Sequence, residues 1–296
     1  MPELLCIGHA AWDLALKVAT IPGPDEKARA TARAAGGGGP AATAACTAAR
    51  LGAKVAFAGR IGQDWAGDCL LDEFSAFGVD ARFVRRTDAP TPISAILVRE
   101  RDGARTIANH NPGGWLERLD WGGIRPQWVL ADGHEPLLAE HWLGKAPMIL
   151  DAGSLHPGTE RLMRRVEVLA ASERFAREAT QHRDPKAMLA ALAGWVPYVV
   201  ITLGERGLVW AAEGERGAMP AFAIEAVDTT GAGDVFHGAL AWALLRGKPW
   251  PEALRWAQGA AAIACTGFGA RTWLPTADEV RHFLAAASLR DDCVEV

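Results

Sequence analysis

The chain has 296 residues, of which 50% are hydrophobic and 22% are charged, with a formal net charge of −4. This size and composition predict a globular protein with a large core, organised as one domain over residues 1–296. The small negative charge gives no electrostatic footprint for nucleic acid or an anionic membrane surface. No stretch approaches the ~20 apolar residues of a membrane span. We therefore expect neither a nucleic-acid partner nor a membrane partner.

The cysteine pattern and the first residues bear on the compartment. Five widely spaced cysteines show no metal-binding motif; they are Cys6, Cys46, Cys69, Cys265 and Cys293. Free thiols in a reducing compartment are the simplest interpretation. The N-terminal residues lack the basic and apolar regions of a secretory signal. The sequence therefore predicts a cytoplasmic protein.

Short apolar runs alternate with helical patterns along the chain. The runs predicted to be strands are residues 4–8, 55–59, 128–132, 148–151 and 198–203. The helical patterns cover residues 41–51, 67–77, 161–170, 234–246, 250–266 and 276–287. This alternation predicts an α/β fold, with a doubly wound and mostly parallel sheet covered by helices on both faces. Ligands then bind at the carboxyl ends of the strands.

Two segments depart from this alternation. Residues of about 14–34 and 92–110 alternate apolar and polar side chains better than they follow a helical period. We predict that both segments leave the main sheet and form a small β-sheet lid. An exposed sheet of this size is marginally stable alone, so we expect a second subunit to cover it and form a homodimer.

The most informative motif is DTTGAGD at residues 228–234, between a predicted strand at 222–227 and a predicted helix. Backbone N–H groups at a helix start attract anions, and the motif's glycines permit close approach by a phosphate. Asp234 could simply cap this helix. A carboxylate beside such an anion site also suits a base that deprotonates a hydroxyl during phosphoryl transfer.

With this motif the sequence resembles the ribokinase, or pfkB, family of carbohydrate kinases, whose signature is DTxGAGD leading into a helix. Weaker motifs occur in the family's order at residues 8–13, 37–39, 50–53, 59–64 and 200–204. The resemblance implies a ribokinase-like fold and ATP-dependent phosphorylation of a primary hydroxyl of a sugar. It implies that Asp234 is the catalytic base.

The same resemblance implies roles for the residues around Asp234. Those matching the family's anion hole are Gly231, Ala232 and Gly233. Those matching its nucleotide side are Thr202, Gly204, Gly207 and Thr230. The cofactors implied are ATP and Mg²⁺, and the need for a monovalent cation is left open.

One element departs from the family pattern. The NxxE element, associated with magnesium and phosphate, would fall at residues 172–175, where the sequence is SERF. Both the Asn and the Glu are missing there. Glu173 is interpreted as a surface helix residue or as a group acting through water. We therefore predict no direct metal ligand and expect Mg²⁺ to be held mainly by ATP and solvent.

The resemblance also implies which residues bind the acceptor. Asp13 would accept hydrogen bonds from sugar hydroxyls, and Gly38 and Gly39 would allow close approach; Asp13 is alternatively a turn residue. Residues 37–45 and 228–240 are most similar to kinases of 6-deoxy-6-sulfofructose, which implies phosphorylation at C1 of that or a related ketose.

In those kinases a lysine, an asparagine and an arginine hold the sulfonate. Lys27 and Asn109 match the first two, and His134 stands in place of the arginine, without its bidentate geometry. Each has an alternative interpretation: Lys27 as a solvated turn residue, Asn109 as a turn cap and His134 as a structural histidine. His237, one turn after Asp234, is interpreted as a packing residue.

Other functions stay open at this point. Within the family, the alternatives are a fructose-type, a sugar-acid or a nucleoside kinase, because lid chemistry rather than fold selects the acceptor. A different class is a non-catalytic protein that binds a sugar or nucleotide, favoured by the altered NxxE element and opposed by Asp234. A dinucleotide-binding oxidoreductase is disfavoured, because the glycines at 36–39 lack GxGxxG spacing.

Overall fold

A computed structural model of the protein describes residues 1–290 and 294. Within them the main sheet has nine strands in the order β13-β12-β11-β10-β9-β8-β1-β4-β5. In chain order these are β1 (Leu4–Ile7), β4 (Val55–Gly62), β5 (Asp80–Thr87), β8 (Trp128–Ala131), β9 (Met148–Ala152), β10 (Val168–Ser172), β11 (Tyr198–Thr202), β12 (Leu208–Ala212) and β13 (Glu215–Met219). All neighbouring pairs are parallel except β11–β12 and β12–β13. The mostly parallel sheet is as predicted.

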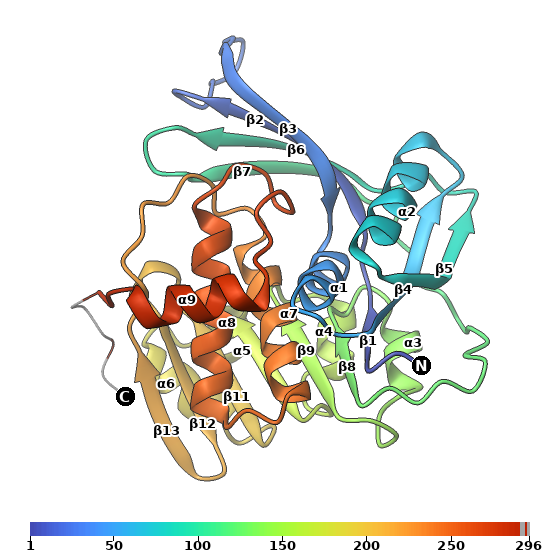
Figure 1. The fold of residues 1–296 in the computed structure, drawn as a ribbon, viewed down its shortest axis with the longest axis vertical. Helices are drawn as coiled ribbons and strands as arrows, with labels where there is room; N and C mark the ends of the chain where they lie inside the picture. Colours follow the sequence, from blue (N-terminus) through green and yellow to red (C-terminus); the bar gives the residue numbers. More distant parts are fainter. Residues whose placement is uncertain (291–293, 295–296) are drawn as a thin grey trace.

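Helices cover both faces of this sheet (Figure 1). One face carries α1 (Pro40–Arg50), α2 (Trp65–Phe77), α7 (Ala232–Leu245), α8 (Trp250–Cys265) and α9 (Ala277–Ala286). The other carries α3 (Pro136–Glu140), α4 (Pro157–Leu162), α5 (Glu173–Thr180) and α6 (Pro185–Leu192). In β1, Leu4 and Cys6 enter the first core, whereas Leu5 and Ile7 enter the second. Burial on both faces explains why the strands are continuous apolar runs.

A second sheet of four strands, in the order β3-β2-β6-β7, extends away from the main sheet (Figure 1). Its strands are β2 (Ala11–Val18), β3 (Ala30–Gly38), β6 (Ile93–Arg99) and β7 (Arg105–His110). This sheet corresponds to the predicted lid. Its first segment is longer than the predicted residues 14–34, because β2 begins at Ala11 and β3 ends at Gly38. The lid strands therefore include Asp13, Gly37 and Gly38, whereas Gly39 precedes α1.

The packing of α1 against α7 ties the glycine run to the DTTGAGD motif. Gly238 of α7 lies so close to α1 that an added Cβ would be 2.4 Å from the Ala44 carbonyl oxygen. α1 follows the glycine run directly, and α7 carries Asp234. This close approach requires a residue without a side chain, so it fixes the two halves of the site relative to each other.

Two predicted elements are wrong. Residues 222–227 are extended but form no strand; Phe222 makes an isolated bridge to Leu289. Around this bridge the backbone bonds, among the described residues, only to residues 288–290, with Ala223 donating to the Ser288 carbonyl and Arg290 donating to the Ala221 carbonyl. Residues 161–170 are not one helix, because α4 ends at Leu162 and β10 begins at Val168. A short buried apolar run fits either period, so the pattern alone could not separate helix from strand.

Two further features bear on the sequence predictions. Among the described helices, none has the length and apolar character to cross a membrane. The described cysteines are all free thiols: Cys6, Cys46, Cys69 and Cys265. Cys293 lies outside the described residues.

Candidate active site

The start of α7 forms a backbone anion site. Gly231 precedes the helix with φ 76°, in the left-handed region that favours glycine, and no side chain caps the first turn. Within residues 1–290, the N–H groups of Gly231 and Gly233 have no acceptor, whereas the Ala232 N–H reaches the Thr229 carbonyl at 3.3 Å. Unpaired N–H groups at a helix start attract phosphate oxygens. The three residues of the predicted anion hole thus lie together at one helix start.

The buried Asp228 carboxylate closes the loop before α7. Its oxygens accept the N–H groups of Thr230 at 2.9 Å and Gly269 at 3.0 Å. The Thr230 hydroxyl is buried and has no partner in the described part of the chain. Arg105, on lid strand β7, donates to the Thr229 hydroxyl at 2.8 Å. The loop is therefore rigidly closed on one side and joined to the lid on the other.

Asp234 is the third residue of α7, directly after the anion site. Its carboxylate lies in a group with Asp151 and His237. One oxygen of each carboxylate and one ring nitrogen of the imidazole are all within 4.8 Å of one another. Burial, and next the Asp151 carboxylate, raise the pKa of Asp234 to about 7, against the lowering effect of His237 and Arg105. A carboxylate with this pKa is a strong base for its type when ionised and is close to half ionised at neutral pH.

On the acceptor side, one row of the lid sheet brings polar residues together. Asp13 pairs with Gly36 on β3 and with Ser94 on β6, and Ser94 pairs with Asn109 on β7. Paired residues on neighbouring strands place their side chains on the same face. The Asp13 Oδ1 atom is buried without a partner among the described residues. Burial raises the pKa of Asp13, and Ser94 and Arg271 oppose that rise.

The glycine run lies against Asp13. An added Cβ at Gly38 would be 2.0 Å from the Asp13 Oδ2 atom. Gly39 has φ 88°, and a Cβ there would be 2.5 Å from the His9 carbonyl oxygen. The backbone therefore requires glycine at position 39, whereas a side chain at Gly38 would displace the Asp13 carboxylate.

Two charged side chains from distant parts of the chain hold this run in place. Arg271 is buried and donates to the Gly38 carbonyl at 2.6 Å, the Thr43 hydroxyl at 3.1 Å and the Glu73 carboxylate at 3.1 Å. Glu73 also accepts the Gly37 N–H at 2.9 Å. Arg271 and Glu73 thus hold the backbone of Gly37 and Gly38, where it passes close to the Asp13 carboxylate.

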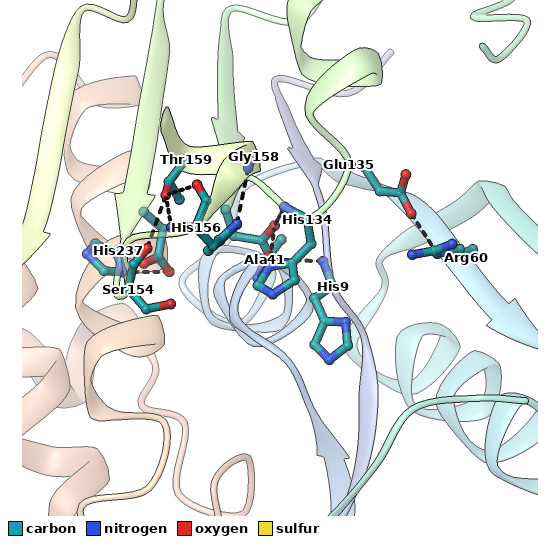
Figure 2. A network of polar contacts seen from close by, with 12 residues as sticks. His9, Ala41, Arg60, His134, Glu135, Ser154, His156, Gly158, Thr159 and His237 are labelled. Atoms are coloured by element: carbon teal, nitrogen blue, oxygen red, sulfur yellow. Dashed lines mark hydrogen bonds and ion pairs between the residues drawn. The ribbon is translucent and has the colours of Figure 1, made fainter. Parts of the chain in front are cut away.

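His134 lies at the carboxyl end of β8, in a row of imidazole rings (Figure 2). Its ring centroid is 4.8 Å from that of His9 and 4.8 Å from that of His156. The Asp132 carboxylate accepts the His134 N–H at 2.9 Å and lies 3.2 Å from the ring Nδ1 atom. It also accepts the N–H groups of His9 and Ala41 at 2.8 and 3.1 Å. His134 therefore has a structural partner at the edge of the cleft.

The rings in this row differ in charge. Burial lowers the pKa of His9 to about 4 and also lowers the pKa of His156. Burial opposes protonation of His134 as well, but the Asp132 carboxylate raises the pKa of His134 above its ordinary value. Only the central ring of the row is thus inclined to carry a proton near neutral pH.

The residues predicted to bind the nucleotide include three at the carboxyl end of β11. Thr202 is its last residue, and Gly204 begins the short 3₁₀ helix η1 (Gly204–Arg206) with φ 64°. Gly207 has φ 87°, and an added Cβ would be 2.0 Å from the Met219 carbonyl oxygen. These residues share the carboxyl edge of the sheet with β8 and β9, which is where ligands bind in such folds.

The altered NxxE element offers no spare ligand for Mg²⁺. The Ser172 hydroxyl donates to the Gly153 carbonyl at 2.8 Å and accepts the Phe175 N–H at 3.0 Å. The Glu173 carboxylate pairs with Arg206 at 2.6 Å. Mg²⁺ prefers several oxygen ligands and retained waters. Because both side chains are already paired within the protein, this element fits a direct Mg²⁺ ligand poorly.

Lys27 does not belong to the row of lid residues that contains Asp13 and Asn109. It is exposed in the segment that joins β2 to β3. Val18 at the end of β2 is five residues beyond Asp13, about 17 Å at about 3.3 Å per residue. Lys27 follows in the loop between this strand end and the start of β3 at Ala30.

Sequence reasoning missed several polar residues of the site. They are Arg105, Asp151, His9, His156 and Arg271; of these only His9 lies within a motif named above, and it was not singled out there. Only the arrangement of the strands and the loop after α8 brings them to the cleft. The one available signal was position, since His9 and Asp151 each end or follow an apolar run predicted to be a strand.

Unpaired N–H groups at a helix start, a carboxylate of raised pKa beside them and a second buried carboxylate suit a phosphotransferase. A sequence model of the pfkB family of carbohydrate kinases matches residues 1–115 and 143–277. The chain therefore belongs to the pfkB family of carbohydrate kinases. The enzyme class inferred from DTTGAGD, an ATP-dependent carbohydrate kinase, is confirmed.

Individual relatives agree with this family. The chain is 29% identical to the ribokinase of Bacillus subtilis, covering 96% of this chain and 100% of the relative. It is 30% identical to the aminoimidazole riboside kinase of Salmonella typhimurium, over 85% of this chain and 89% of the relative. The structure of Arabidopsis thaliana ribokinase complexed with ribose and ATP superposes with a TM-score of 0.82 at 26% identity, covering 96% of this chain and 98% of that one. The ribokinase-like fold is therefore confirmed.

Proposed function

We propose that this kinase transfers the γ-phosphoryl group of ATP to a primary hydroxyl of a small sugar, with Asp234 as the base. The acceptor hydroxyl gives its proton to the Asp234 carboxylate as its oxygen attacks the γ-phosphorus, and the bond to the ADP oxygen breaks. The N–H groups of Gly231, Ala232 and Gly233 stabilise charge on the transferred group. The position of the Asp234 carboxylate beside unpaired helix-start N–H groups is the observation that carries this proposal.

For the acceptor, Asp13 supplies the main hydrogen-bonding group. Its unpaired, buried Oδ1 atom needs a donor, and a sugar hydroxyl supplies one. Asn109 shares its row on the lid, and Gly38 and Gly39 leave room for close approach. His134, which follows β8 at the carboxyl edge of the sheet, would add a hydrogen bond from its ring to the acceptor.

For the donor, Thr202, Gly204, Gly207 and Thr230 surround the nucleotide. The unpaired Thr230 hydroxyl supports this assignment. Mg²⁺ would arrive with ATP and, when bound, neutralise phosphate charge, since the altered NxxE element has no free ligand. Dependence on a monovalent cation beside the loop at 228–230 is tested by titrating K⁺ against Na⁺ in the activity assay.

The acceptor class is tested by an ATP-coupled panel of ketoses, their 6-phosphates, 6-deoxy-6-sulfofructose, ribose, sugar acids and nucleosides. Our proposal is a ketose-type acceptor, including 6-deoxy-6-sulfofructose phosphorylated at C1, with ribose and nucleosides as the alternatives. The kinases named among the relatives act on ribose, fructose and aminoimidazole riboside. Turnover of a single class would decide among them, and ATP binding without turnover of any acceptor would favour a non-catalytic binding protein.

Lys27→Ala separates anionic from neutral acceptors in the same panel. If the lid closes over an anionic acceptor, loss of the ammonium group is expected to raise KM for 6-phosphates and sulfonates by about 10-fold while neutral sugars change little. Steady-state kinetics with one matched pair, fructose and its sulfonate, measure this difference. Equal changes for both acceptors would make Lys27 a solvated lid residue.

We also propose that the lid forms a homodimer interface. Leu14 and Ile93 are 40% and 38% exposed on the lid face opposite Asp13. Exposed apolar residues grouped on a thin sheet favour a covering partner. Sedimentation is expected to give a dimer, and Leu14→Lys combined with Ile93→Lys is expected to give a monomer. A wild-type protein that sediments as a monomer at micromolar concentration would contradict this proposal.

A further inference from the structure

A buried acid–imidazole pair lies directly behind the proposed catalytic base. His237 Nδ1 is 2.8 Å from Asp151 Oδ2, and the two side chains are only 4% and 3% exposed. His237 is one helical turn after Asp234, so both side chains project from the same side of α7. Asp151 comes from a different element, strand β9. Figure 2 shows His237 at one end of the polar network along this edge of the sheet.

The charged groups around this pair come from four elements. His237 faces Asp151 from β9 and Asp234 from its own helix; Asp234 in turn faces Arg105 and Asp13 from the lid. Burial alone would lower the pKa of His237, but the Asp151 carboxylate at 2.8 Å and Asp234 raise it above its ordinary value. Both carboxylates thus favour a proton on the imidazole, which would make it a cation between them, and none of the steps proposed above uses it.

Removing that cation would leave two carboxylates facing each other in a buried site. Two such groups cannot both ionise easily, and they tend to share a proton. A shared proton would occupy Asp234, the group that must be ionised to accept the hydroxyl proton. A positive charge on His237 lowers the pKa of Asp234 and so favours its ionised, basic form.

We propose that Asp151 and His237 are positioning residues that keep the Asp234 carboxylate ionised, with Asp151 holding the imidazolium and the imidazolium holding the base. This inference rests on the proposed function of Asp234. It reassigns His237, which the sequence pattern had indicated as a packing residue.

The test is the pH profile of kcat/KM for one acceptor, measured for the wild type, His237→Gln, Asp151→Asn and the double variant. Because an ionised base is required, wild-type activity falls as pH drops through about 7. His237→Gln is expected to move this acid limb upward by about 1 pH unit or more. Adding Asp151→Asn to it removes the opposing carboxylate and is expected to move the limb back down.

The reversal distinguishes charge from packing. If His237 were only structural, the activity losses of His237→Gln and Asp151→Asn would add in the double variant, and the acid limb of the pH profile would not shift. That result would overturn the inference. His182→Gln is the matched control, because His182 is exposed in the segment that follows α5 and should leave the limb unchanged. If Asp234→Asn retains full turnover, the proposed base itself fails; if Asp234 is essential but His237→Gln leaves the limb unmoved, only this inference fails.

Discussion

Asp234→Asn is expected to lower kcat by about 1,000-fold, within the range of a lost general base. The amide has nearly the same shape as the carboxylate, so the start of α7 and its N–H groups stay in place. It cannot accept the hydroxyl proton, however, and the acceptor oxygen attacks as a neutral alcohol. Steady-state turnover with saturating ATP and acceptor measures this loss.

Two controls make that result specific. ATP affinity, measured by calorimetric titration, should change little, because in the proposed arrangement the nucleotide contacts the anion site and not the base. Glu225→Gln makes the same carboxylate-to-amide change on an exposed residue of the same segment and should leave kcat unaltered. Turnover within about 10-fold of wild type in Asp234→Asn would remove Asp234 from the role of base.

Asp13→Ala is expected to raise KM for the acceptor by about 10- to 100-fold and to leave KM for ATP nearly unchanged. A hydrogen bond to a charged group contributes about 1.5–3 kcal/mol, which corresponds to that range. The Asp13 Oδ1 atom has no partner among the described residues, so its hydrogen-bonding capacity is available to the acceptor. Initial-rate kinetics with each substrate varied in turn separate the two KM values.

Asp72→Ala is the matched control for that change, since Asp72 is exposed on α2. Gly38→Ala offers a second route to the same group, because its Cβ would be 2.0 Å from the Asp13 Oδ2 atom. Both Asp13→Ala and Gly38→Ala should affect the acceptor more than ATP. Equal effects on the two substrates would place Asp13 in the folding of the lid instead of in acceptor binding.

The features predicted correctly from the sequence are those determined by local patterns. Apolar runs predicted β1, β4, β8, β9 and β11, because strands buried on both faces must be apolar throughout. The alternating lid segments were recognised for the opposite reason, since one lid face meets solvent. The position of Asp234 after a glycine-rich helix start followed from a motif within seven residues.

Features that depend on distant contacts were not predictable in this way. β10 was assigned to a helix because four buried apolar residues fit either period. Arg271 reaches Gly38 across 233 positions of sequence, and no local pattern indicates such a contact. The Asp151–His237 pair likewise exists only because β9 ends beneath α7.

The central claim, that this chain phosphorylates a sugar hydroxyl with Asp234 as base, is tested most directly by ³¹P NMR of the reaction mixture. With the acceptor identified in the panel, the wild type should form ADP and a sugar phosphate monoester in equal amounts, with the phosphorus coupled to a CH₂ group. Asp234→Asn should form neither at a comparable rate. Release of ADP with inorganic phosphate alone, or an equal rate of monoester formation by the variant, would contradict the account.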